Sequence, residues 1–187
     1  MNIAILGWGS LIWDDHPEFD THRESWLPDG PNLPLEFSRI SSSRLGALTL
    51  VIDENYGDIC RVAYTMSKRQ NPDDAICDLR CREGTTHNNI GYYYADHSRS
   101  GRPIIPDGIK LWAQQKKIDV VVWAGLASNF ETKCGIPFSV EAALSYLKNL
   151  SPEGKAKAAE YIFRAPDFVR TSLRSSVEIA PWFPARE

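Results

Sequence analysis

The stretch NIAILGWGSL, residues 2–11, decides how the chain begins to fold. Residues 2–6 form an apolar run that ends at a pair of glycines, which predicts a short buried strand followed by a sharp turn. Glycines allow positive φ angles and let the backbone approach a ligand closely. Successive amides in such a turn, with the Ser10 hydroxyl, suit an anion or a carbonyl oxygen. A plain tight turn fits the same residues.

Outward from this strand, the patterns indicate an α+β fold. Period-2 alternation predicts strands over 35–40, 45–53 and 59–66, the last two joined as a hairpin by the turn at 54–57. Residues 89–95 predict a further strand, and the apolar run 118–126 predicts one that is covered on both faces. We expect residues 14–34 to form an ordered loop. Helices are predicted over residues 71–83, 107–117, 139–150, a stretch from 151 onward, and 166–175. Residues 177–182 are expected to form a closing strand or a packed tail.

Length and composition favour a single domain over residues 1–187. The mixture of an antiparallel hairpin with helices predicts a small mixed β-barrel that helices surround. The formal net charge of −3 argues against nucleic acid as a partner. The apolar start is too short to cross a bilayer and lacks the features of a secretory signal. Cysteine usage fits reduced thiols and a cytoplasmic location. A zinc site is the alternative for Cys77 and Cys81, although no second pair of this type follows.

Several standard site motifs fail on this sequence. The glycine turn has Ile12 at the third position of a dinucleotide fingerprint, and no Gly-Lys-Ser/Thr follows it. Ser10 lacks the second glycine of a nucleophile elbow, and nothing selects a histidine as its base. A metal site at Asp15, His16 and His22 matches no standard ligand spacing. We therefore expect neither a cofactor nor a metal.

Glu83 is the carboxylate that helical spacing singles out. Ile76, Leu79 and Glu83 share one helix face, so Glu83 is expected to point toward the core at the last turn, before Gly84. Burial and the helix dipole both favour its protonated form, which suits proton transfer near neutral pH. A salt bridge with Arg80, Arg82 or Arg39 is the structural alternative. Arg39 is itself unusual, because it continues the apolar face of Leu35 and Phe37.

Two landmarks then coincide. LGWGSLIW (residues 6–13) follows the first strand, and LRCREG (residues 79–84) closes a helix some seventy residues later. Together they resemble the γ-glutamylcyclotransferase-like family, especially its ChaC-type and bacterial branches. The stretch between them, LPLEFSRISSSRLGALTLVIDENYGDICRVAYTM (residues 33–66), is similar to the family's central strands. The resemblance covers roughly residues 1–95, and it departs from the family pattern at Trp8, where a tyrosine is usual.

The resemblance implies a γ-glutamylcyclotransferase-like fold and a metal-independent enzyme that cyclises a γ-glutamyl amino acid, peptide or amine to 5-oxoproline. The partner is then a small γ-glutamyl substrate, without nucleic acid or membrane. Glu83 would transfer protons, the Gly9, Ser10 and Leu11 amides would hold a carboxylate or oxyanion, and Arg39 would pair with the substrate carboxylate by strand parity. The proposed binding turn is Gly7, Trp8, Gly9, Ser10 and Leu11. A non-catalytic small-ligand or protein-binding member of the same fold is the alternative. Leaving group and oligomeric state cannot be read from the sequence.

Overall fold

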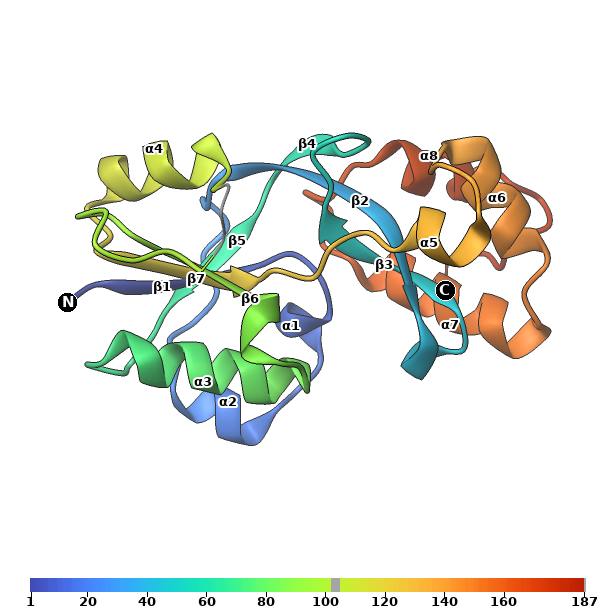
Figure 1. Ribbon diagram of the computed structural model, residues 1–187. Coiled ribbons are helices and arrows are strands. Elements are labelled where there is room, and N and C mark those ends of the chain that lie inside the picture. The colour runs from blue at the N-terminus through green and yellow to red at the C-terminus, as the bar shows by residue number, and fades with distance from the viewer. Residues whose placement is uncertain (102–104, 187) are drawn as a thin grey trace. The chain divides into compact units, whose positions relative to one another are not determined.

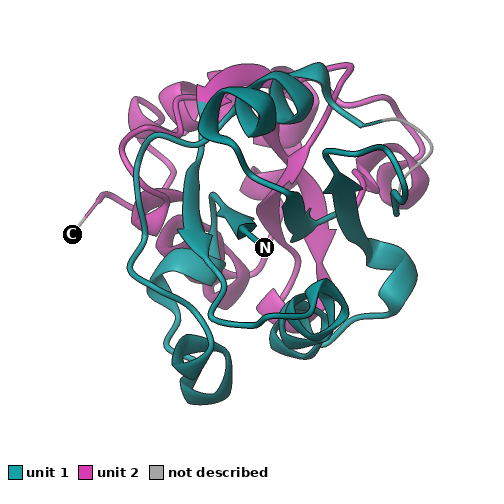
Figure 2. Cartoon of the chain, turned by 90° about the vertical axis from the view of Figure 1, so that its left-hand side faces the viewer, with its two compact units in different colours: residues 1–33, 61–126 teal, residues 34–60, 127–187 magenta. Residues whose placement is uncertain are grey.

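The computed structural model describes residues 1–101 and 105–186 and has mixed α+β architecture (Figure 1). Its residues group into two compact units, each made of two sequence segments (Figure 2). Unit 1 comprises residues 1–33 and 61–126, and unit 2 comprises residues 34–60 and 127–187. The α+β class expected from the sequence is confirmed.

Unit 1 is built on one open sheet. In chain order its elements are β1 (Ile3–Gly7), α1 (Ser10–Trp13), α2 (Pro17–Thr21), β5 (Ala63–Met66), α3 (Pro72–Glu83), a 3-10 turn (His87–Asn89), β6 (Ile90–Tyr94), α4 (Asp107–Lys116) and β7 (Val120–Ala124). The strand order is β5-β1-β7-β6, with β1 parallel to β7 and the other two pairs antiparallel. α3 and α4 lie on opposite sides of this sheet (Figure 1).

The core of unit 1 lies between its sheet and helix α3. Ile76 and Leu79 of α3 pack with Ile3, Ile5 and Val122 of the sheet, and all five side chains are buried. β7 is buried from Val120 to Trp123, which confirms the predicted strand with two covered faces. A continuous apolar run is what a strand between two helical layers requires.

Gly91 marks the tightest approach in this sheet. It pairs with Trp123 across β6 and β7, and a Cβ added at Gly91 would lie 2.1 Å from Cε2 of the Trp123 ring. The ring is 2% exposed and enclosed by the core, so it has little room to move. Glycine is therefore required here by the space that the indole occupies.

We expect Gly91→Ala to lower the free energy of unfolding by about 3 kcal/mol, at the upper end of typical overpacking costs. Urea denaturation followed by circular dichroism measures this. Gly84→Asn is the comparison, because no atom lies within 4 Å of its added Cβ and asparagine tolerates the positive φ found there. Equal costs at the two positions would contradict the steric explanation.

Unit 2 contains the second sheet. Its elements are β2 (Asn32–Ser41), a 3-10 turn (Ser42–Arg44), β3 (Ala47–Ile52), β4 (Asp58–Arg61), α5 (Phe130–Cys134), α6 (Val140–Lys148), α7 (Pro152–Arg164) and α8 (Ser172–Glu178). The strand order is β3-β2-β4, so this sheet is open as well. Within the described residues, neither sheet closes on itself as a barrel.

The predicted hairpin over residues 45–66 is wrong. Its turn forms as expected, since the Asp53 side chain accepts hydrogen bonds from the amides of Asn55 and Tyr56. The two arms do not pair, however, because β2 lies between β3 and β4. The run 59–66 also divides at Val62, which exchanges backbone hydrogen bonds with Gly30 and Pro31, and its second half becomes β5 of unit 1.

Helix boundaries agree more closely with the sequence. Asn71, Ser139 and Ser151 cap α3, α6 and α7, each accepting an amide hydrogen bond in the first turn. The last helix, expected over 166–175, instead begins at Ser172 with Thr171 as its cap, and it ends at Glu178. Residues 177–182 therefore form no strand. No helix in the described parts of the chain is long and apolar enough to span a membrane.

Candidate functional site

The turn after β1 leads directly into a one-turn helix, α1, with Gly9 at its N-cap. Gly9 has φ −129°, and the glycines with positive φ in the described chain are Gly46, Gly84 and Gly135. Neither Gly7 nor Gly9 therefore uses the positive φ that glycine allows. Trp8 is 5% exposed, so its ring is part of the protein interior.

Close packing is what requires a glycine at position 7. A Cβ added at Gly7 would lie 2.7 Å from two ring carbons of Trp26, which comes from the segment 14–34. The Trp26 ring also packs against the unit 1 core. The loop predicted over 14–34 thus covers the start of the turn with an aromatic side chain, and it contains the short helix α2, which sequence patterns did not reveal.

Glu83 is the last residue of α3, and its side chain is 18% exposed. Gly84 ends the helix in the left-handed conformation, as expected. Ile76 and Leu79 on the same face are buried, so Glu83 continues a core-facing stripe and lies at its margin. Arg82 is its ion-pair neighbour, with Nη1 3.9 Å from Glu83 Oε1. Of the three arginines considered from the sequence, Arg82 has this contact.

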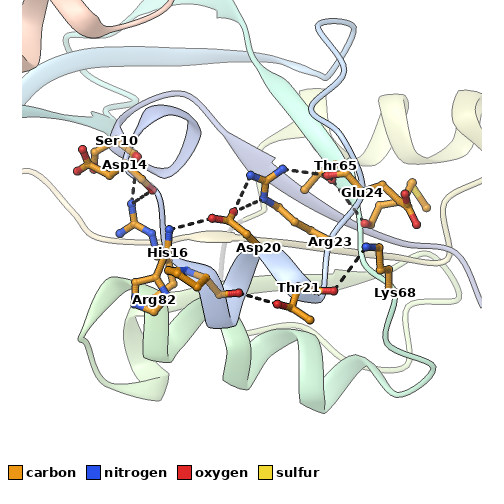
Figure 3. A network of polar contacts seen from close by, with 12 residues as sticks. Ser10, Asp14, His16, Asp20, Thr21, Arg23, Glu24, Thr65, Lys68 and Arg82 are labelled. Atoms are coloured by element: carbon orange, nitrogen blue, oxygen red, sulfur yellow. Dashed lines mark hydrogen bonds and ion pairs between the residues drawn. The ribbon is translucent and has the colours of Figure 1, made fainter.

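Arg82 also connects Glu83 to the turn. Its Nη2 donates to the backbone carbonyls of Ser10 at 3.0 Å and of Asp14 at 3.4 Å (Figure 3). The guanidinium is largely buried, with 11% of the side chain exposed, so these contacts are shielded from water. One side chain therefore lies between the carboxylate of Glu83 and the Gly7–Leu11 turn. Sequence reasoning named Arg82 only as a salt-bridge partner and missed this bridging role.

The segment after α1 is held in place by a polar network around Asp20 (Figure 3). The Asp20 carboxylate accepts from the His16 amide at 2.8 Å and pairs with Arg23 at 2.6 Å. Burial alone would raise the pKa of Asp20, but the hydrogen bonds from His16 and Arg23 lower it below its ordinary value. Arg23 in turn lies over the Trp26 ring, 5.1 Å from its centre. The network therefore orders the segment that carries Trp26.

Arg39 belongs to unit 2, whereas Glu83 and the turn belong to unit 1. Its Nη1 donates to the Ala127 carbonyl at 2.8 Å, and burial lowers the pKa of its guanidinium. The strand parity used to place it is interrupted, because the register between β2 and β3 shifts between Glu36 and Arg39. Glu36 and Ser38, expected on the polar face, are fully buried. A substrate contact for Arg39 stays a prediction.

His16 and His22 line a shared pocket in unit 1, but Asp15 is not among its lining residues. Across residues 1–101 and 105–186, no three His, Cys, Asp or Glu side chains are grouped so that they could hold a metal ion. The cysteines are free thiols: Cys60 is buried, Cys134 is half-buried, and Cys77 and Cys81 are exposed on α3.

We expect Gly7→Ala to destabilise the protein by about 2 kcal/mol, because the new methyl group would displace the Trp26 ring. The same substitution made in a Trp26→Ala background should cost less than half as much, since the clash is then removed. Urea denaturation of the four proteins gives the coupling energy. An unchanged cost in the two backgrounds would show that Trp26 is not what excludes a side chain at position 7.

The chain matches no protein-family model, no curated protein and no solved structure.

Proposed function

We propose that this chain is a γ-glutamylcyclotransferase-like enzyme, which cyclises a γ-glutamyl amino acid, peptide or amine to 5-oxoproline and releases the amine. The observation that supports it best is the Arg82 side chain, which contacts both Glu83 and the Ser10 carbonyl. This contact joins Ser10 and Arg82, 72 residues apart and one from each landmark, which supports a site that uses both.

The cyclisation makes modest demands on the protein. The α-amine of the substrate attacks its own γ-carbonyl carbon, so the new C–N bond closes a five-membered ring without an enzyme nucleophile. Holding the reacting atoms in place supplies part of the roughly 7–11 kcal/mol that ideal orientation provides. Glu83 takes a proton from the α-ammonium group before attack and returns one to the departing nitrogen.

The backbone amides of Gly9, Ser10 and Leu11 are assigned to the substrate carboxylate or to the oxygen that becomes negative during attack. Trp8 replaces the hydroxyl-bearing tyrosine that is usual at this position, and its ring is buried. The indole donates through nitrogen alone, so we expect substrate choice to differ from that of relatives with tyrosine.

The proposal includes a γ-glutamylcyclotransferase-like arrangement of the α+β elements as the finer description of the fold, without the closed barrel expected from the sequence, which the described residues do not form, and a cytoplasmic location from cysteine usage. The partner is a small γ-glutamyl molecule. The alternative is a non-catalytic binding protein of the same fold. It is favoured by two observations at the turn: the Trp26 ring packs on Gly7, and Trp8 stands in place of tyrosine.

A substrate panel separates these two functions. Purified protein is incubated with γ-glutamyl amino acids, glutathione and γ-glutamyl amines, and 5-oxoproline is measured against enzyme-free blanks. Product that increases in proportion to enzyme supports the proposal, and the preferred leaving group identifies the substrate. If no substrate yields product at high enzyme concentration and long incubation, the enzyme hypothesis is wrong and the binding protein is favoured.

A further inference from the structure

The outer face of α3 carries two thiols that share one cation. Cys77 and Cys81 are exposed, and helical spacing makes them neighbours on the surface. The Nη2 atom of Arg80 lies 3.6 Å from each sulfur. These contacts, first with Cys77 and then with Cys81, raise the pKa of Arg80. The guanidinium is thus placed to pair with either sulfur when that sulfur reacts.

Cys81 differs from Cys77 in what lies beside it. Cys81 lines a pocket of about 400 Å³, together with residues of α2 and its flanks, one residue that precedes α3, and Asp78 of α3. The other lining residues are His16, Glu18, Phe19, Thr21, His22, Arg69 and Asp78. Asp78 is neutralised there by a two-point pairing with Arg69, at 2.8 and 2.9 Å. The thiol therefore opens onto a space large enough for a small molecule.

His16 supplies a polar group that the pocket leaves without a partner. Its Nδ1 atom is buried and, within the described residues, has no hydrogen-bond partner. Buried polar atoms are nearly always paired in folded proteins, so an unpaired ring nitrogen in a pocket wall suits a group brought in by a ligand.

The remaining two thiols have environments that suppress reaction. Burial raises the pKa of Cys60 and also that of Cys134, which disfavours the thiolate in both. The thiolate is the form that attacks disulfides and other electrophiles. Cys77 and Cys81 are the exposed thiols, and of these two the pocket is lined by Cys81.

We propose that Cys81 is a thiol–disulfide exchange site that accepts half of a low-molecular-weight disulfide into the adjacent pocket. The Cys81 thiolate attacks one sulfur of the small disulfide, and the bond between its two sulfurs breaks. A mixed disulfide forms on Cys81, and the other half leaves as a thiolate that takes a proton from water. A free thiol reverses the reaction by the same exchange.

Cys77 does not resolve this adduct. Residues four apart on a helix have Cβ atoms about 5–6 Å apart. A disulfide needs them within about 3.5–4.5 Å, so closing one here would require α3 to unwind locally. The mixed disulfide on Cys81 therefore persists until an external thiol removes it.

The test uses the full chain and oxidised glutathione as the probe, with intact-mass measurements over time and peptide mapping without reduction. We expect one adduct, on Cys81, formed about tenfold faster than any adduct on Cys134. Cys77→Ser should keep it, Cys81→Ser should abolish it, and Arg80→Gln should slow it by about threefold or more. Circular dichroism establishes that each variant is folded.

Three results would overturn the proposal. The first is an adduct that forms on Cys77 as fast as on Cys81, because the pocket then contributes nothing. The second is a Cys81→Ser protein that is modified at the rate of the unaltered chain. The third is an unchanged rate in Arg80→Gln, which removes the role of the shared cation. None of these readouts depends on 5-oxoproline formation, so the exchange site and the proposed enzyme can fail separately.

Discussion

Glu83→Gln is expected to reduce the rate of 5-oxoproline formation by about 10²–10⁴-fold, the usual contribution of a general acid–base group. Glutamine has nearly the same shape but cannot accept the proton of the α-ammonium group. Because the side chain is 18% exposed at the margin of the core, the substitution should leave the protein folded. The measurement is kcat with the best substrate of the panel, alongside circular dichroism of both proteins.

Asp74→Asn provides the matched control, since Asp74 is an exposed carboxylate in the first turn of the same helix. It should retain the activity of the unaltered chain. If the Glu83→Gln protein forms product at more than about a tenth of the normal rate, the assigned role is wrong. A general acid–base group contributes far more than tenfold to the rate. Equal losses in the two variants would point to the charge of the helix rather than to Glu83.

Glu36 is expected to make the protein markedly less stable above neutral pH. This carboxyl group is completely buried in β2. It accepts hydrogen bonds from the amides of Phe37 at 2.7 Å and Leu173 at 3.3 Å, the latter at the start of α8. Burial raises the pKa of Glu36 from 4.5 to about 7, although hydrogen bonds, that of Thr171 foremost, oppose the shift. The neighbouring carboxylate of Asp58 acts in the same direction as burial.

The sign of the effect follows from proton binding. Below pH 4.5 the carboxyl is protonated in both folded and unfolded chains, and its full contribution to stability is present. Between 4.5 and about 7 the unfolded chain releases its proton while the folded chain retains it, so stability falls as the pH rises. Above about 7 both forms are ionised, and the contribution has decreased by about 3 kcal/mol.

Urea denaturation at pH 5 and at pH 8 measures this difference. In Glu36→Gln the decrease in the free energy of unfolding between pH 5 and pH 8 should be smaller by about 2.5 kcal/mol, because glutamine stays neutral and the unfolded glutamate is already partly ionised at pH 5. The measurement compares stability at two pH values within each protein. The comparison is therefore valid even if glutamine packs less well than glutamate at both pH values. Glu141→Gln, at an exposed site on α6, should keep the original dependence. If the stability of Glu36→Gln depends on pH as strongly as that of the unaltered chain, the ionisation of Glu36 does not destabilise the folded protein.

Elements with local signals could be predicted from the sequence. α3 is the clearest case, since Asn71, Pro72 and Gly84 mark both of its ends, and the structure has the helix between them. The last helix could not be placed, because its start depends on Asp58, 114 residues away. Asp58 accepts from the amide and the hydroxyl of Ser172, so the helix begins there and not at the proline-aspartate pair.

The candidate site likewise contains residues that have local sequence signals and contacts that depend on distant parts of the chain. Glu83 and the Gly7–Leu11 turn were both found from spacing and motif. The contacts of Arg82 with Ser10 and of Trp26 with Gly7 could not be predicted, because they join distant parts of the chain. For Arg39, the period-2 argument assumed a regular strand, and the shift in register after Glu36 removes that assumption.

The sequence by itself determined the α+β composition and most helix boundaries, and it singled out Glu83 and the Gly7–Leu11 turn as candidate site residues. Capping, proline and glycine preferences and apolar periodicity act over a few residues, so they are visible in one dimension. The tertiary structure decided that β2 separates β3 from β4, that Arg82 connects Glu83 to the turn, and that Trp26 covers Gly7. Strand pairing and side-chain contacts between distant parts of the sequence depend on which apolar surfaces are buried against each other. Those surfaces meet only when distant segments of the chain pack.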